Sequence, residues 1–225
     1  MHDECIPTPN EEKWLNIAEG YQQRAQFPHC IAVVDSNYCF TFIDVGSFGK
    51  DSDSTIFKNS TLHKHLQNNS LNVPKPNLIH GIQIPMLYAF VGDEAFGLST
   101  NMLRPYAGKC LPVNKRIFNY RLSRARRHVE CAFGILSNKW RIFHRPIDVD
   151  VELVIDIVKC CCVLHNFVRA RDGYDFEDSL TVTGMEDIEL DNNFNVNRSV
   201  NRYRDALANY FSSELGQVAW QNEKI

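Results

Sequence analysis

The sequence has no run of apolar residues that approaches the roughly 20 needed for a membrane-spanning helix. Its N-terminal residues 1–10 are polar and contain no apolar core of the kind found in secretory signal peptides. A Walker phosphate-binding loop, a GxSxG nucleophile elbow and a Cys/His nucleophile arrangement are also missing. These absences argue against a membrane protein, against secretion, and against nucleoside-triphosphatase or serine-hydrolase chemistry.

The sequence also lacks any Cys-x-x-Cys pair, although it contains eight cysteines. Three of them, Cys160 to Cys162, are consecutive in an apolar, helix-like run. Structural zinc sites and disulfide frameworks need separated, paired cysteines, so neither is predicted. We interpret most of the cysteines as small buried side chains of a protein in a reducing compartment.

Negative charge is nearly absent from residues 115–145, which hold nine Lys or Arg residues, two His residues and one acidic residue, Glu130. The net charge of −3 conceals this block, because eight acidic residues follow between positions 172 and 191. A basic segment attracts phosphates, and a single carboxylate within it needs a reason. A divalent metal ion held against a nucleic-acid backbone is the simplest one.

The basic block has the apolar spacing of a long helix. The apolar positions are Phe118, Leu122, Ala125, Val129, Ala132, Phe133, Leu136 and Trp140. At roughly 100° per residue, Glu130 falls at the border of this stripe, near Arg126. It can therefore reach a cleft, or it can simply form an i, i+4 ion pair with Arg126 on a solvated helix. Arg121, Arg124, Arg127 and His128 are expected to face solvent or a partner.

With 225 residues, of which 44% are hydrophobic, the chain can bury one substantial core. We predict a peripheral N-terminal helix in residues 1–30, a main α/β domain in 31–170, an acidic flexible linker in 171–199, and a C-terminal helix with a tail in 200–225. Within the domain, the predicted elements are a hairpin of strands 31–35 and 39–45, a helix over 55–67, a buried strand over 86–91, the basic helix, and a helix over 151–170.

Three carboxylates stand out when these elements are combined with the charge pattern. Asp53 closes a Gly/Ser-rich loop, Asp93 follows the buried strand, and Glu130 lies in the basic helix. Oxygen ligands from separate elements suit Mg²⁺ or Mn²⁺, which complete their coordination with waters and substrate phosphates. A carboxylate at the carboxyl end of a buried strand is also a favoured position for chemistry in α/β sheets.

Several of these segments resemble the PIF/Harbinger transposases. Residues 91–96 followed by 103–106 are similar to that family's second-Asp motif, and residues 118–136 to its catalytic-Glu helix. Residues 162–167 resemble the closing helix, and residues 45–57 the glycine loop. The resemblance covers about residues 8 to 170, with a further match at 218–221.

The resemblance implies an α/β fold with an RNase H-like mixed sheet flanked by helices, a divalent metal cofactor (Mg²⁺ or Mn²⁺), and a nuclear location. It implies Asp93 and Glu130 as catalytic residues, with Asp53 as a further metal ligand. The residues that would contact DNA are Arg124, Arg126, Arg127, Lys139 and Arg141. The family also pairs with Myb-like DNA-binding proteins, so DNA and such a protein are the expected partners.

One departure from the family pattern concerns the first catalytic carboxylate. In the family, a segment like residues 27–30 leads into a strand that bears this Asp, but here Cys30 runs directly into Ile31 and what resembles the following strand. The sheet is thus expected to be incomplete by one central strand. Asp35 and Asp44 could face the cleft, but we interpret them as polar residues at strand ends. Two functions stay open: a metal-dependent DNA nuclease, or a catalytically dead domesticated transposase that binds DNA or protein.

Overall fold

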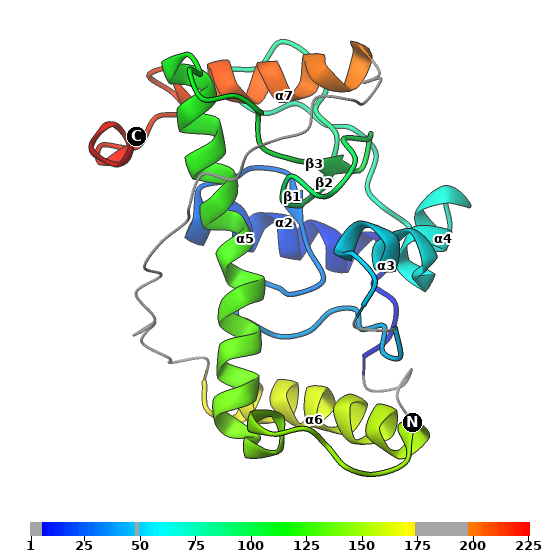
Figure 1. The fold of residues 1–225 in the computed structure, drawn as a ribbon. Helices are drawn as coiled ribbons and strands as arrows, with labels where there is room; N and C mark the ends of the chain where they lie inside the picture. Colours follow the sequence, from blue (N-terminus) through cyan, green and yellow to red (C-terminus); the bar gives the residue numbers. More distant parts are fainter. Residues whose placement is uncertain (1–5, 48–49, 174–197) are drawn as a thin grey trace.

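The computed structural model describes residues 6–47, 50–173 and 198–225 (Figure 1). They form a mixed α/β fold of three parallel strands and six α-helices. The helices are α2 (Glu11–Ala25), α3 (Asp53–Asn59), α4 (Thr61–Gln67), α5 (Val113–Lys139), α6 (Val151–Arg171) and α7 (Arg198–Phe211). The strands are β1 (Cys30–Ile31), β2 (Ala89–Val91) and β3 (Met102–Leu103), and the 3-10 helices are η1 (Arg141–His144) and η2 (Gln221–Lys224). Most of the predicted linker, residues 174–197, lies outside the described residues.

The sheet is small, and β2 lies at its centre. Its order is β1-β2-β3 with both pairs parallel, so that Ile31 lies opposite Phe90 and Phe90 opposite Met102. The apolar run at 86–91 predicts a buried strand, and β2 with its buried Ala89 and Phe90 confirms it. Because parallel strands end at one edge, the residues that follow β2 and β3 lie side by side.

Helix α2 forms as predicted but lies in the core rather than at the periphery. The Asn10 side chain accepts a hydrogen bond from the amide of Lys13, which caps the first turn. Trp14 and Tyr21 are fully buried, and the Trp14 ring meets Phe90 of β2 edge-on at 5.6 Å between centroids. The helix is therefore one wall of the main core, which it shares with the sheet.

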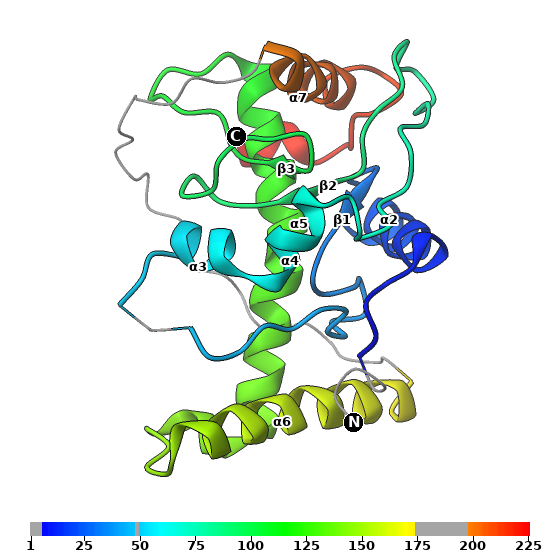
Figure 2. The same ribbon diagram turned by 90° about the vertical axis from the view of Figure 1, so that its right-hand side faces the viewer.

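Helix α5 runs through the length of the molecule, with α7 beside its upper end and α6 across its lower end (Figures 1 and 2). Its first half packs into the main core with α2, the sheet and α7. Its second half, from Ala132 to Leu136, joins a smaller core with α6 and the segment around Val34 and Phe40. The predicted stripe is buried over most of its length, but Phe133 is 55% exposed. Within the described ranges, no helix combines the length of a membrane span with a sufficiently apolar composition.

The predicted hairpin over 31–45 is present only around its turn: Val34 and Phe40 form an antiparallel bridge, and the amides of Asp35 and Thr41 donate to the carbonyls of Cys39 and Val33 at 2.9 and 2.8 Å. The Asp35 carboxylate accepts hydrogen bonds from the amides of Asn37 and Cys39, which closes a tight turn. The outer edge of Phe40 binds a side chain instead of a further strand. The Asn166 amide on α6 binds its N–H at 2.8 Å and its carbonyl at 2.7 Å. A helix side chain thus satisfies the backbone edge that faces away from Val34.

The helix predicted over 55–67 is two helices, because the chain turns at Ser60. This residue has extended backbone angles, and its hydroxyl accepts from the amide of His63 as the N-cap of α4. Helix α3 contacts the sheet's edge through Phe57, whose ring lies 5.5 Å from that of Phe96. The predicted helices over 151–170 and near 200–215 are both present, as α6 and α7.

Candidate functional site

Asp93 is fixed in position directly after β2. The preceding Gly92 donates its amide hydrogen to the Leu103 carbonyl at 2.8 Å, and a Cβ there would lie 2.9 Å from the Phe96 ring. Only glycine therefore fits at this close approach. One carboxylate oxygen of Asp93 accepts a hydrogen bond from the Ala95 amide at 2.8 Å, which orients the other oxygen toward α5.

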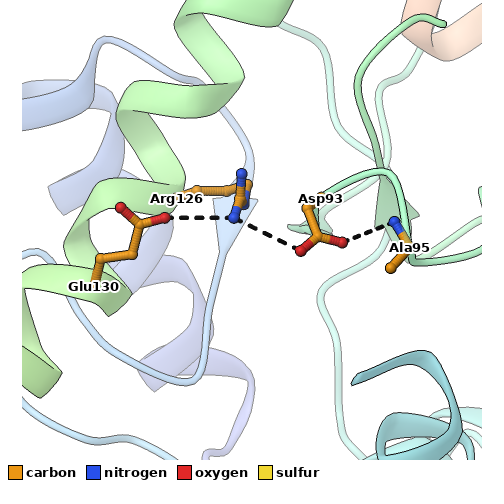
Figure 3. Close-up of polar contacts among 4 residues, drawn as sticks. All are labelled: Asp93, Ala95, Arg126 and Glu130. Carbon is orange, nitrogen blue, oxygen red and sulfur yellow. Dashed lines mark hydrogen bonds and ion pairs between the residues drawn. The ribbon is translucent and has the colours of Figure 1, made fainter. Parts of the chain in front are cut away.

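Glu130 lies on α5, one turn beyond Arg126, and the same arginine joins it to Asp93 (Figure 3). The Arg126 Nη2 atom lies 3.4 Å from Glu130 Oε1 and 3.8 Å from Asp93 Oδ2. The predicted i, i+4 pair of Arg126 with Glu130 is thereby confirmed. The three side chains are 24% (Arg126), 28% (Asp93) and 42% (Glu130) exposed, so solvent screens these ion pairs and they add little stability. Their importance is positional: two carboxylates from distant segments meet around one positive charge.

The donor set fits a divalent cation. Mg²⁺ is commonly bound by one or two carboxylates, with waters and substrate phosphates as the other ligands. Asp93 and Glu130 supply two such carboxylates, both partly open to solvent. The guanidinium of Arg126 lies between them in Figure 3, so it would have to move aside for a metal ion to bind both.

Asp53 does not complete a three-carboxylate centre in this structure. Asp53 is the first residue of α3, and its side chain is exposed. Among the residues that the structure describes, no group of three or more His, Cys, Asp or Glu side chains is arranged to hold a metal ion. The assignment of Asp53 as a metal ligand stays a prediction.

Asp35 and Asp44 have local roles, as interpreted from the sequence. Asp35 closes the turn described above, and one Asp44 oxygen accepts from both the amide and the hydroxyl of Thr61, at 2.7 and 2.9 Å. Thr61 is the first residue of α4, so Asp44 fixes the start of that helix. Neither side chain has a contact with Asp93 or Glu130.

The predicted DNA-contacting residues differ in how free they are. Arg124 is half-buried: it donates to Gln26 Oε1 at 2.8 Å and stacks over Trp220 at 4.1 Å. Arg126 binds the two carboxylates, while Arg127 is half-buried. Lys139 and Arg141 are exposed at the end of α5 and the start of η1. The two exposed residues and Arg127 are thus the best placed to meet a phosphate.

The expectation that Arg121 and His128 face solvent is wrong. Arg121 is 1% exposed and donates to the carbonyls of Gln26 and Gly216 and to Gln221 Oε1. Burial, reinforced by Arg124, lowers its pKa to about 10, so it stays charged near neutral pH. His128 is 9% exposed between the rings of Tyr21 and Tyr38, and burial lowers its pKa as well. The C-terminal segment and α2 cover this face of α5, which helical spacing alone does not reveal.

Comparison with known proteins agrees with this arrangement. The sequence pattern of the DDE superfamily endonucleases matches residues 17–166, about two thirds of the chain. The chain belongs to the DDE superfamily endonucleases. The matched region contains β2, the whole of α5 and most of α6, and hence Asp93, Arg126 and Glu130.

One curated relative is the "Protein ALP1-like" of Arabidopsis thaliana, which is 28% identical over 177 residues. The alignment covers 76% of this chain but 41% of the relative, so the chain spans less than half of that protein's length. No solved structure matches the chain.

In this DDE superfamily endonuclease we expect Arg126→Gln to strengthen Mn²⁺ binding by about tenfold, because the variant removes the cation that competes for both carboxylates. The matched control is Arg127→Gln, which removes the same charge from the next residue of α5. Titration of each purified variant with Mn²⁺, followed by electron paramagnetic resonance of the free ion, measures the affinity. Unchanged affinity in Arg126→Gln would show that the guanidinium does not compete with the metal.

Proposed function

We propose that this chain is the nuclease domain of a Harbinger-type, transposase-derived protein that binds DNA and hydrolyses its phosphodiester bonds with a divalent metal ion. The observation that supports it is the meeting of Asp93 and Glu130 around Arg126, within the region that matches the DDE superfamily endonucleases. The parallel β1-β2-β3 order, with Asp93 directly after the central strand, is consistent with an RNase H-like sheet. A nuclear location and a Myb-like protein partner belong to the same proposal.

In this proposal the chain's own residues bind and orient the DNA. Arg127, Lys139 and Arg141 attract the backbone phosphates, and Asp93 and Glu130 are the cation's protein ligands. The bound divalent ion supplies activation of water and stabilisation of the leaving oxygen. Gly92 and the Ala95 amide keep the Asp93 carboxylate directed at α5, so that the site is preorganised on one side.

A second candidate function is a module that binds DNA or protein without cutting it. Two observations favour it. By the resemblance to the Harbinger family, the strand with the first catalytic Asp would be missing between Cys30 and Ile31. In addition, Asp35 and Asp44, the acidic residues that follow Ile31, are engaged in a turn and a helix start.

One assay separates the two functions: nicking of supercoiled plasmid by the full chain in the presence of Mn²⁺. If the chain is a nuclease, Asp93→Asn and Glu130→Gln should each lower the nicking rate at least 100-fold, since each loses a metal ligand. Glu94→Gln is the matched control, because it removes a neighbouring carboxylate that makes no contact with Arg126. Equal nicking by the wild type and both site variants would overturn the nuclease assignment.

The binding function is measured in the same preparations without a metal ion. Retention of a DNA duplex that weakens steeply between low and moderate salt indicates phosphate contacts, whereas retention that is insensitive to salt does not. DNA retention without nicking would establish the DNA-binding form of the second candidate, and the absence of both would overturn the nuclease and the DNA-binding module together.

A further inference from the structure

A polar cavity lies beside α5. Its volume is about 180 Å³, and it lies between the end of α2, the turn at Tyr38 and the middle of α5. Its lining consists of Arg24, Ala25, Tyr38, Arg124, Arg127 and His128. At roughly 100° per residue, Arg124 projects from a different side of α5 than Arg126 and Glu130, and Arg127 lies between Arg124 and Glu130, about 60° from each.

The three arginines that line this cavity have no carboxylate partner among the described residues. Arg24 donates to the carbonyl of Ser36 at 2.9 Å, and Arg124 donates to the side-chain oxygen of Gln26. Arg127 makes no hydrogen bond or ion pair within the described part of the chain. A guanidinium has five N–H donors, so all three keep donors available, and their charges add in a space with no acidic residue.

The cavity walls are held in place by ring contacts. Arg124 lies over the Trp220 ring at 4.1 Å, and the Tyr38 and His128 rings are stacked with centroids 5.4 Å apart. The Trp220 contact holds the Arg124 guanidinium in position before any ligand arrives, which reduces the entropy lost on binding.

We propose that this cavity binds a phosphate group, with Arg24, Arg124 and Arg127 as its ligands. Arginine pairs well with phosphate because its planar fork of N–H donors matches two phosphate oxygens. The volume of about 180 Å³ far exceeds the ~30 Å³ that one water molecule occupies in the liquid, so a tetrahedral anion fits. The phosphate can belong to a DNA backbone, which rests on the proposed function, or to a small phosphate ion.

The test follows the imidazole signals of His128 by NMR while inorganic phosphate is added to the full chain, with chloride at matched ionic strength as the reference. No DNA or divalent metal is present, so the result is independent of the nuclease assay. At constant pH, phosphate, but not chloride, should shift these signals and reach saturation, because His128 lines the cavity. Arg127→Gln should weaken this binding roughly tenfold, because it removes one charge-assisted contact.

Arg116→Gln is the matched control, since it removes the same charge from an exposed position on the same helix. Arg24→Gln removes a phosphate ligand that lies on α2, and it should weaken phosphate binding as well. Displacement of phosphate by a short DNA duplex would assign the site to the DNA backbone, and binding without displacement would assign it to a small phosphate ion. The proposal is overturned if phosphate leaves the His128 signals unchanged, or if Arg116→Gln weakens binding as much as Arg127→Gln.

Discussion

We expect Arg121→Ala to lower the free energy of unfolding by roughly 3–5 kcal/mol, because the variant leaves several buried acceptors without a donor. The Arg121 guanidinium serves the carbonyls of Gln26 and Gly216 and the side-chain oxygen of Gln221. Each buried acceptor that loses its partner costs about 1–3 kcal/mol, and entry of water into the space offsets part of this. The stacking of the guanidinium on Phe211, at 4.4 Å, is lost as well.

Urea unfolding of the wild type and the variant measures this loss through the transition midpoint, with the slope held constant. Arg116→Ala is the control: it is an exposed arginine of the same helix and should change stability by less than about 0.5 kcal/mol. A loss below about 1 kcal/mol in Arg121→Ala would mean that water molecules hydrogen-bond to these three acceptors in the variant, and that the Arg121 hydrogen bonds add little to the stability of the fold.

The second large effect is expected at Trp14, where Trp14→Ala should cost roughly 3–5 kcal/mol. The side chain is fully buried, its Nε1 donates to the Leu71 carbonyl at 2.8 Å, and its ring contacts Phe90. Truncation to alanine leaves a cavity beside β2, the strand that carries Asp93. It also leaves the Leu71 carbonyl without its donor.

Two further variants separate the causes of that loss. Trp14→Phe keeps most of the apolar volume but removes the N–H donor, so it should cost only about 1–3 kcal/mol. Leu15→Ala changes the next residue, which is 42% exposed, and should cost less than about 1 kcal/mol. Thermal unfolding followed by circular dichroism measures all three. Equal losses for the Trp14 and Leu15 variants would contradict a central position of α2 in the core.

The helices and the central strand could be predicted from the sequence because each depends on a local pattern. The apolar positions of α5 and α6 repeat at helical spacing, and the Asn10 cap marks the start of α2. The short extent of the hairpin could not be predicted, because Ile31 pairs with Phe90 in the parallel sheet and Phe40 also binds Asn166, a residue 126 positions further along the chain. A strand-like pattern shows that a segment is extended, but it does not show which partner the backbone will have.

The candidate site was predictable only in part for the same reason. The charge pattern identified Glu130, and the apolar run placed Asp93 at the end of a strand. Helical spacing also gave the Arg126–Glu130 pair. The contact of Arg126 with Asp93, and the covering of Arg121 and His128, depend on segments far away in the chain. Arg24 and Tyr38 could not be linked to the basic helix from the sequence, because nothing in their neighbourhood marks them.

The hydrogen bonds of Arg121 with Gln26, Gly216 and Gln221 determine where the chain can safely be shortened for expression. A recombinant piece trimmed to the region that matches the endonuclease pattern, residues 17–166, would lack Trp14 at one end and Phe211 and Gln221 at the other. The Arg121 guanidinium would then lie beside an exposed apolar surface, and such a product is expected to precipitate. Boundaries for crystallisation should therefore follow the packed interior and retain both ends of the polypeptide.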